Sequence, residues 1–428
     1  MSEMSDKIRP TKKLRIAQIS KADAFGGGAS RVAEDLTDAL SDNGHVVHHF
    51  CSWSGKGFNA PRKSLYGKKE AFTRRLHTVG KRLGFPEYIP FELSSIIARG
   101  LIDKYDIFHF HDLSSAISPN TLSYIARFKP VVWTFHDCSP FTGGCLYPMG
   151  CENFKVEKGC GSCPQIGQWP IDSKFDFTRT LRNSKARLFK KGITPVTPSH
   201  WMADMAMSSQ IVPQRPHVIS NGINTSTYQA YPKKALREEL GIPKDRMVVL
   251  LSAGHLEDER KGTKFALQVL KLLKDINPFV VVMGQANEQF LSTLSPLDYK
   301  AVGYVSSQED LNRYYSLADL FLFCSLADNQ PLSIIEALCS GTPVAGFATG
   351  GIPEQIKQEK TGFLVENQDI AQLASRIKQA FESGDLKKWS KAAAKLAPDE
   401  FSALRLAADH EALYLNLLSQ RKLAKINA

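Results

Sequence analysis

The chain has 428 residues, 43% of them hydrophobic, and this length predicts two or three domains with large buried cores. The N-terminal stretch is polar and no apolar run approaches membrane-spanning length, so we expect no secretory leader and no transmembrane segment, and predict a cytoplasmic protein. The formal charge of +11 admits nucleic acid, anionic membranes or anionic small molecules as partners, and charge alone does not choose among them.

Short apolar runs alternate with helical patterns along the first half of the chain. The opening elements are a strand at 14–19, a glycine turn at 26–28, a helix at 30–40 and a strand at 45–50. Further strands are predicted at 107–110, 131–134 and 194–196. Such alternation predicts a parallel sheet that is covered by helices on both faces.

A basic amphipathic helix is predicted in the stretch from residue 62 to residue 83. Its apolar residues recur at helical spacing: Phe72, Leu76, Val79 and Leu83. Its basic residues are Lys68, Lys69, Arg74, Arg75, Lys81 and Arg82. Such a helix can lie on anionic lipid headgroups, which would make the protein peripheral at the inner face of a membrane. The alternative is an ordinary solvated helix whose apolar stripe packs into the core.

A second doubly wound set of elements follows the turn signal Asn221-Gly222. Its predicted strands are 247–252, 279–283, 301–304, 320–323 and 343–347. Apolar residues at helical spacing after Pro398 predict a last helix. We therefore expect an N-terminal domain at 1–215, a C-terminal domain at 216–398, and a helix at 399–428 that crosses back to the N-terminal domain.

Two acids stand eight positions apart in the second half. Asp328 falls in the loop after the strand 320–323, and Glu336 lies inside the following helix, so both can face a ligand at the carboxyl end of the sheet. Carboxylates suit sugar or ribose hydroxyls because each accepts several hydrogen bonds in fixed directions. A pair of acids by itself is more often surface charge. The glycine turn 26–28 can approach a diphosphate, although a plain structural turn would also explain it.

These motifs carry a resemblance to a known family. The segments 325–354, 27–44, 134–137 and 218–224 resemble the retaining glycosyltransferases of family 4, whose GT-B fold has two Rossmann-like, doubly wound α/β domains facing a central cleft. The stretch 136–164 resembles a bacterial subgroup that builds colanic acid and related exopolysaccharides. The resemblance implies sugar transfer from a nucleoside-diphosphate sugar on the C-terminal domain to a saccharide acceptor, lipid-linked in our expectation, on the N-terminal domain.

The resemblance also implies roles for residues that would bind the donor. Glu336 matches the family glutamate that holds the ribose hydroxyls. Asp328 stands where the family usually has its first glutamate, near the donor sugar, and its shorter side chain changes the reach by one methylene. The remaining positions expected to contact the donor are Gly27, Gly28, Leu332 and Ser333.

Basic residues and a histidine complete the implied catalytic set. Lys261, which precedes a glycine, matches the family lysine, whereas His255 stands where an arginine is usual. Arg260 is expected to supply that charge, because the leaving diphosphate gains negative charge as the glycosidic bond breaks. The alternative is that Arg260 and Lys261 form a solvated turn. His136 matches a family histidine that faces the donor sugar, although a lone histidine is more often structural.

The sequence contains no Asp-x-Asp triplet, so we expect no catalytic metal, and positive side chains and helix dipoles would take its place. Two alternatives remain. One is a phosphorylase on the same fold, and the other is a non-catalytic protein that binds sugar or nucleic acid through its basic surface. The acid pair argues against the second alternative, and we expect no nucleic-acid partner.

Five of the eight cysteines fall between Cys138 and Cys163. Four of them predict a structural zinc shell: Cys145, Cys151, Cys160 and Cys163. The ion would pin the loop behind His136 without touching the sugar chemistry. The alternative is a group of free or transiently oxidised thiols, and stable disulfides are disfavoured in a reducing cytosol.

Overall fold

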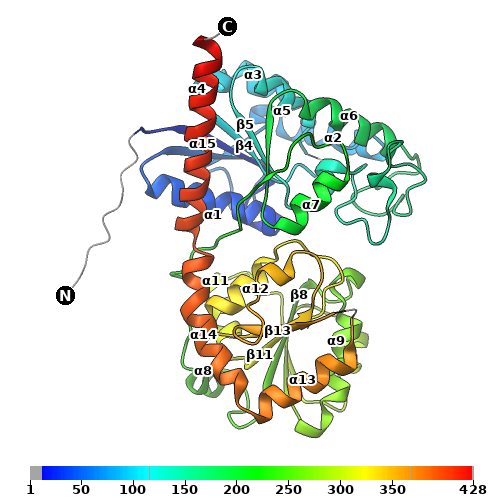
Figure 1. Ribbon diagram of the computed structural model, residues 1–428, viewed down its shortest axis with the longest axis vertical. Coiled ribbons are helices and arrows are strands. Elements are labelled where there is room, and N and C mark those ends of the chain that lie inside the picture. The colour runs from blue at the N-terminus through cyan, green and yellow to red at the C-terminus, as the bar shows by residue number, and fades with distance from the viewer. Residues whose placement is uncertain (1–11, 115, 367, 427–428) are drawn as a thin grey trace, which may run out of the picture. The chain divides into compact units, whose positions relative to one another are not determined.

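The computed structural model describes residues 12–114, 116–366 and 368–426, which form two compact units. The first unit comprises residues 12–221 and 403–426, and the second comprises residues 222–402 (Figure 1). Each unit is built on one all-parallel sheet, of seven strands in the first and six in the second. The doubly wound α/β fold predicted from the alternation of strands and helices is therefore confirmed.

The sheet of the first unit has the order β3-β2-β1-β4-β5-β6-β7. Its strands are β1 (Arg15–Ala22), β2 (Val46–Trp53), β3 (Arg62–Ser64), β4 (Ile107–Phe110), β5 (Val131–Thr134), β6 (Ile193–Thr197) and β7 (His217–Val218). The edge strands β3 and β7 escaped the sequence prediction because three and two residues are too few to show a periodicity. The strand order reverses between β1 and β4, which is where ligands bind in open parallel sheets.

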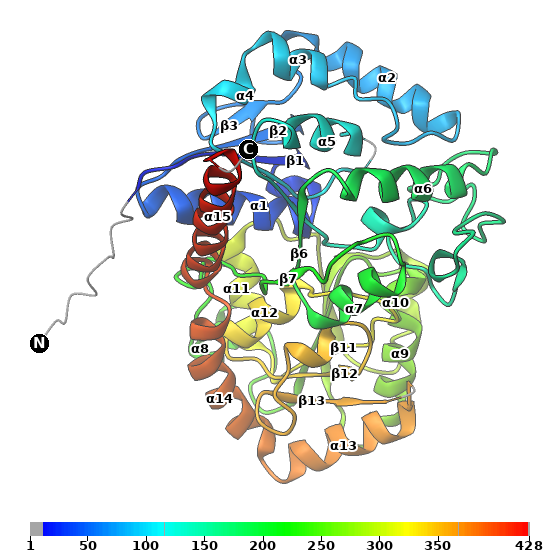
Figure 2. The same cartoon turned by 45° about the horizontal axis from the view of Figure 1, so that its top comes forward.

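Helices cover both faces of this sheet. They are α1 (Gly28–Asp42), α2 (Glu70–Arg82), α3 (Leu93–Ala98), α4 (Leu101–Lys104), α5 (Pro119–Ala126), α6 (Thr178–Phe189), α7 (His200–Ser208) and α15 (Ala403–Ile426). Helix α5 begins where the Ser118 hydroxyl accepts a hydrogen bond from the Asn120 N–H, with proline at the first helical position. Helices α1 and α15 lie on one side of the sheet and α5 lies on the other (Figures 1 and 2).

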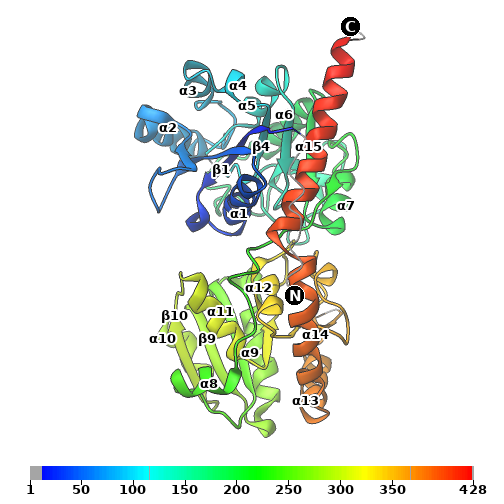
Figure 3. The ribbon, with the colours of Figure 1, turned by 90° about the vertical axis from the view of Figure 1, so that its left-hand side faces the viewer.

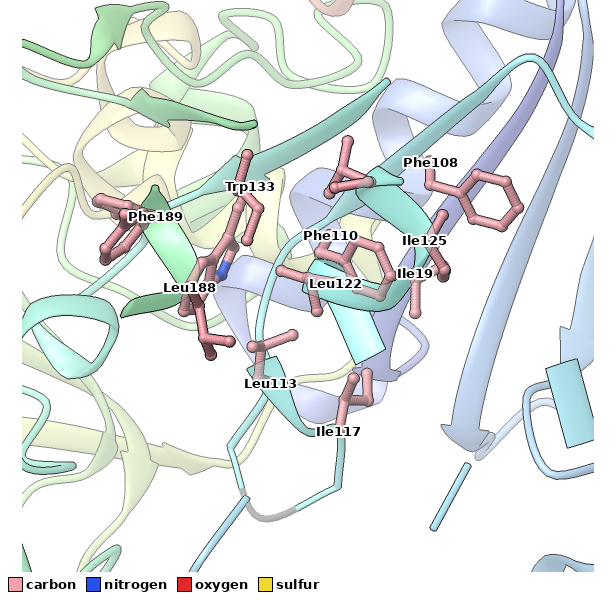
Figure 4. Close-up of a cluster of buried hydrophobic side chains, with 14 of the residues drawn as sticks. Ile19, Phe108, Phe110, Leu113, Ile117, Leu122, Ile125, Trp133, Leu188 and Phe189 are labelled. Atoms are coloured by element: carbon pink, nitrogen blue, oxygen red, sulfur yellow. The ribbon is translucent and has the colours of Figure 1, made fainter. Parts of the chain in front are cut away.

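Alternation along the central strands separates an apolar face from a polar one. Phe108, Phe110 and Trp133 belong to the hydrophobic cluster beneath α5 and α6 (Figure 4). The residues between them point the other way, because successive side chains of a strand lie on opposite faces. His109 accordingly reaches Tyr414 on α15, at 2.7 Å. The first unit thus carries buried polar groups beneath its C-terminal helix.

The second unit has the strand order β10-β9-β8-β11-β12-β13. Its strands are β8 (Val248–His255), β9 (Phe279–Gln285), β10 (Tyr299–Gly303), β11 (Leu320–Phe323), β12 (Val344–Phe347) and β13 (Gly362–Val365). Its helices are α8 (Lys233–Glu239), α9 (Thr263–Leu272), α10 (Glu288–Ser292), α11 (Gln308–Leu317), α12 (Leu332–Cys339), α13 (Ile370–Glu382) and α14 (Asp385–Glu400), many of them visible in Figure 3. The central strands are continuous apolar runs because both faces of the sheet are covered.

Candidate functional site

The turn after β8 and the loop after β11 are hydrogen-bonded to each other at the carboxyl edge of the second sheet. The Leu326 N–H donates to the Arg260 carbonyl at 2.8 Å, and the Arg260 guanidinium donates to the Ala327 carbonyl at 2.9 Å. Gly262 has φ of +64°, and a Cβ there would lie 1.8 Å from the Cys324 carbonyl oxygen, so only glycine permits this approach. The two segments meet because β8 and β11 are neighbouring strands.

This junction holds a carboxylate between two cations. Lys261 Nζ lies 2.8 Å and Arg260 Nη1 lies 3.3 Å from Asp328 Oδ2. Asp328 is only 7% exposed. Burial opposes its charged form, but Lys261 and Arg260 outweigh burial and hold the pKa of the Asp328 carboxyl below its ordinary value. The three residues predicted from the sequence for catalysis in this half of the chain are thus in direct contact.

The second predicted acid, Glu336, lies one turn inside α12 and is 4% exposed. Its carboxylate accepts a hydrogen bond from the Tyr228 hydroxyl at 3.4 Å and is also hydrogen-bonded to Tyr315. Burial, together with the Glu336 charge, raises the pKa of Tyr315 well above its ordinary value. Sequence reasoning missed both tyrosines because no local pattern connects them to α12.

Backbone groups at the start of α12 and at Gly350-Gly351 lie next to Asp328 in the second unit. Pro331 occupies the N-cap position of α12, where its side chain cannot accept a bond from the N–H groups of Leu332 and Ser333. Gly350 has φ of +61°, and a Cβ there would lie 1.9 Å from the Asp328 carbonyl oxygen. The Gly351 N–H donates to that same oxygen at 3.2 Å. The Gly350-Gly351 pair therefore fixes the backbone of Asp328.

The predicted glycine turn of the first unit lies between β1 and α1. Gly27 has φ of +109°, and Gly28 is the first residue of α1. Two buried carboxylates hold the residues that precede the glycines. Asp23 accepts from the Phe25 N–H at 3.1 Å, and Glu34 accepts from the Ala24 N–H at 3.0 Å. Lys56 pairs with Glu34 at 3.1 Å. Sequence reasoning did not identify these two acids.

His136 follows β5 in the first unit and lies beside several ionisable groups. Burial lowers its pKa to about 4, so it is neutral at pH 7, and its Nε2 lies 3.0 Å from His111 Nδ1. The Lys21 ammonium pairs with Asp112 at 2.9 Å. Burial and the Asp112 charge raise the pKa of Asp137 to about 6. A neutral histidine and a carboxyl that is easily protonated thus follow each other just beyond β5.

The structure does not support the predicted zinc shell. Its four cysteines line one apolar cavity of about 20 Å³: Cys145, Cys151, Cys160 and Cys163. Across the described residues, however, no group of three or more His, Cys, Asp or Glu side chains is arranged to hold a metal ion. Burial raises the pKa of Cys145 to about 12, which disfavours the thiolate that binds metals. The buried cations Arg182 and Lys185 of α6 hold this segment instead, by donating to the carbonyls of Phe154 and Ser139.

Helix α2 turns most of its apolar residues outward, although Leu76 is half-buried. Phe72 is 63% exposed and Val79 is 47% exposed, whereas Thr73 and His77 face the protein. The alternative in which the apolar stripe packs into the core is therefore wrong for Phe72 and Val79. Within the described part of the chain, no helix combines the length and the apolar character needed to cross a bilayer.

In doubly wound α/β enzymes, ligands bind at the carboxyl edge of the sheet, and a helix that begins there can meet a phosphate with its N-terminal N–H groups. Comparison with known families agrees with this class. The model described as "Glycosyltransferase Family 4" matches residues 26–227, and the model described as "Glycosyl transferases group 1" matches residues 232–396. The chain therefore belongs to the glycosyltransferases that have a family 4 domain followed by a group 1 domain, and the predicted glycosyltransferase class is confirmed.

Known relatives resemble the chain over most of its length. It is 27% identical to the putative colanic acid biosynthesis glycosyl transferase WcaC of Escherichia coli, over 82% of this chain and 87% of the relative. The sucrose-phosphate synthase of Thermosynechococcus elongatus has a TM-score of 0.69 at 18% identity, covering 95% of this chain and 100% of that chain. Anabaena HepE, solved in complex with UDP-glucose, has a TM-score of 0.63 at 15% identity, covering 95% and 100%. These structures confirm the predicted GT-B fold.

Proposed function

We propose that the protein is a retaining glycosyltransferase of bacterial polysaccharide biosynthesis. It moves a hexose or deoxyhexose from a nucleoside-diphosphate sugar, bound by the second unit, to a saccharide acceptor bound by the first unit. The observation that carries this proposal is the contact of Asp328 with Lys261 and Arg260 at the carboxyl edge of the second sheet. The similarity to the colanic acid relative supports the polysaccharide pathway.

In this proposal the second unit performs the donor chemistry. Arg260 and Lys261 balance the negative charge that grows on the departing diphosphate, and the backbone N–H groups of Leu332 and Ser333 meet its phosphates at the start of α12. Asp328, which contacts both cations, would stand near the donor sugar and accept hydrogen bonds from its hydroxyls. Glu336 holds the ribose hydroxyls, with Tyr228 and Tyr315 fixing its carboxylate in place.

The first unit would bind and orient the sugars. His136, neutral at pH 7, is suited to hydrogen-bond a hydroxyl rather than to carry charge. Gly27 and Gly28 stand at the start of α1, where backbone N–H groups can meet a phosphate oxygen. Retention of configuration follows from the family resemblance, with the acceptor entering on the face from which the diphosphate leaves.

Helix α2 supports a lipid-linked acceptor at an anionic membrane. Its exposed Phe72 and Val79 can enter the headgroup region, and its basic residues are attracted to anionic lipid. A cavity of about 520 Å³ opens beside its start and is lined by Lys68, Lys69 and Arg99 among others. This cavity offers three cations to a phosphate-bearing headgroup. The protein would then act as a peripheral enzyme at the inner face of the membrane.

The donor assignment is tested with two near-isosteric variants. Donors are first identified by thermal shift against UDP-, GDP-, TDP- and ADP-sugars. Glu336→Gln should then weaken binding of the free nucleotide at least tenfold, because hydrogen bonds to a charged group contribute roughly 1.5–3 kcal/mol each. Asp328→Asn should lower kcat more than nucleotide affinity, because its partner is the reacting sugar. Glu382→Gln, an exposed glutamate on α13, is the matched control.

The outcomes of this experiment are distinct. Normal turnover by both variants would contradict the site assignment. Sugar release that depends on added inorganic phosphate would identify a phosphorylase instead. The anomeric configuration of the product, read by NMR, must equal that of the donor, and an inverted product would refute the retaining mechanism.

The membrane proposal is tested by flotation with vesicles of phosphatidylglycerol or of phosphatidylcholine alone. Phe72→Ser combined with Val79→Ser should reduce recovery with the anionic vesicles, and salt should release the parent protein. Leu404→Ser removes an equally exposed apolar side chain from α15 and should change nothing. Equal recovery from both kinds of vesicle would exclude electrostatic docking by α2.

A further inference from the structure

A continuous path of hydrogen bonds, buried as far as His111, links helix α15 to the half-buried His136. The path starts at Tyr414 on α15, whose hydroxyl lies 3.2 Å from Gln18 Nε2 on β1. Gln18 Oε1 lies 2.8 Å from His111 Nε2, just beyond β4. His111 Nδ1 in turn lies 3.0 Å from His136 Nε2, just beyond β5. Four side chains from four segments of the first unit thus form one connected chain.

A branch leaves this path at Tyr414 and runs back into the sheet. The Tyr414 hydroxyl lies 2.7 Å from His109 Nδ1, and His109 Nε2 lies 2.7 Å from the Thr134 hydroxyl. Gln18 and His109 are register partners on the neighbouring strands β1 and β4. Five of these side chains are buried, namely Gln18, His109, His111, Thr134 and Tyr414, whereas His136 is half-buried. A buried polar group is costly unless it is paired. The network is therefore a defined part of the fold.

Each hydrogen bond needs one donor and one acceptor, and with the Gln18 amide oriented as in the structure this requirement fixes the protons. Gln18 Oε1 can only accept, so His111 Nε2 carries a proton. Burial lowers the pKa of His111 well below its ordinary value, so the ring is neutral and its Nδ1 carries a lone pair. His136 Nε2 must then donate to His111 Nδ1, which leaves the lone pair of His136 on Nδ1.

The branch follows the same direction. Gln18 Nε2 donates a hydrogen bond to the Tyr414 hydroxyl, and this hydroxyl donates its own hydrogen bond to His109 Nδ1. Neutral His109 then donates from Nε2 to the Thr134 hydroxyl. Every hydrogen bond in the path and in its branch therefore has one donor and one acceptor. The orientation of the Gln18 amide therefore sets the direction of the whole network.

We infer that Tyr414, Gln18 and His111 are positioning residues that hold His136 in the tautomer protonated at Nε2, so that Nδ1 meets a sugar hydroxyl as a hydrogen-bond acceptor. The identity of the ligand rests on the proposed function, whereas the tautomer is a property of the free protein. The opposite tautomer would present an N–H group at the same place and would reverse the polarity of the contact. In this way the C-terminal helix contributes to the sugar site without touching the sugar.

The tautomer is measured directly by nitrogen NMR. The full-length protein is labelled with ¹⁵N-histidine, and the His136 signals are assigned from the spectrum of His136→Gln. At pH 7 without ligand, His136 should show a protonated, pyrrole-type Nε2 and an imine-type Nδ1. A protonated Nδ1 would mean that the Gln18 amide is rotated and the network reversed, and it would overturn the inference.

Variants test the path link by link. His111→Leu removes the acceptor for His136, and Tyr414→Phe removes the hydroxyl that orients Gln18, so both should give mixed His136 tautomers. His111→Asn keeps an acceptor near the former Nδ1 and should preserve the Nε2-protonated form. Tyr105→Phe is the matched control, because it removes another buried tyrosine hydroxyl, which lies 2.9 Å from His48 Nδ1 outside the path.

Kinetics then separate this inference from the proposed function. Tyr414→Phe should lower kcat roughly fivefold, the equivalent of one neutral hydrogen bond, with little change in donor affinity. An unchanged His136 tautomer in both Tyr414→Phe and His111→Leu would refute the positioning role. If the parent protein shows the Nε2-protonated form but turns over none of the nucleotide sugars, the proposed function fails and the tautomer assignment stands.

Discussion

Replacing Asp137 with asparagine should stabilise the protein, and only above acidic pH. Burial and the Asp112 charge raise the pKa of Asp137 from 3.8 to about 6 in the folded state. The stability that its neutral carboxyl contributes is fully present below pH 3.8 and is lost as pH rises through 6. Each pKa unit corresponds to about 1.4 kcal/mol, so the charged carboxylate costs ~3 kcal/mol at pH 7. Asparagine can still accept the Ser139 N–H bond at 2.8 Å and avoids this cost.

The assay is urea unfolding between pH 4 and pH 8, followed by tryptophan fluorescence. Four of the five tryptophans lie in the first unit, so the signal reports mainly on the unit that contains Asp137. The gain from Asp137→Asn should be small at pH 4 and reach a plateau above pH 6. Asp176→Asn provides a control of opposite sign, because hydrogen bonds from Thr178 and Cys163 outweigh burial and lower the pKa of Asp176. A gain that is independent of pH, or a loss at pH 7, would refute the reasoning.

Two further predictions concern the second unit. Gly262→Ala should cost ~3 kcal/mol in the free energy of unfolding, since the new Cβ would lie 1.8 Å from a carbonyl oxygen. Gly241→Ala has the same φ of +64° and open space around it, so it should cost only about 1 kcal/mol. Lys261→Met should cost about 2 kcal/mol by leaving the buried Asp328 without its nearest cation, and adding Asp328→Asn should restore most of that loss. A double-mutant cycle that is simply additive would show that the ion pair is not coupled.

Local patterns were sufficient for the central strands and helices, and for naming the candidate residues of the second unit. Alternating apolar runs identify the central strands because both faces of a parallel sheet are buried. Asp328 and Lys261 could be named from sequence motifs, and their meeting follows from the adjacency of β8 and β11. A doubly wound fold brings the loops after such strands to one edge, so the approximate location of the site follows from the order of elements.

The basic helix α2 shows that a periodic pattern predicts a helix without predicting which of its faces is buried. Phe72, Val79 and the intervening polar residues predict a helix, but periodicity does not say which face meets the protein. The tertiary structure buries Thr73 and His77, and places His77 Nε2 3.2 Å from the buried Glu92 carboxylate. The cysteine segment illustrates the same limit, since buried cations of α6 hold a loop that its spacing assigned to zinc.

By itself the sequence determined the order of the central strands, the glycosyltransferase class and the candidate acids of the second unit, because these depend on residues close together in the chain. Only the tertiary structure decided the partners of those residues. Tyr228 is 108 positions from Glu336, and Tyr414 is 396 positions from Gln18, yet each pair shares a buried hydrogen bond. Such contacts arise when the helices pack on the sheets and the buried polar groups must find partners away from water. No local pattern in the chain encodes them.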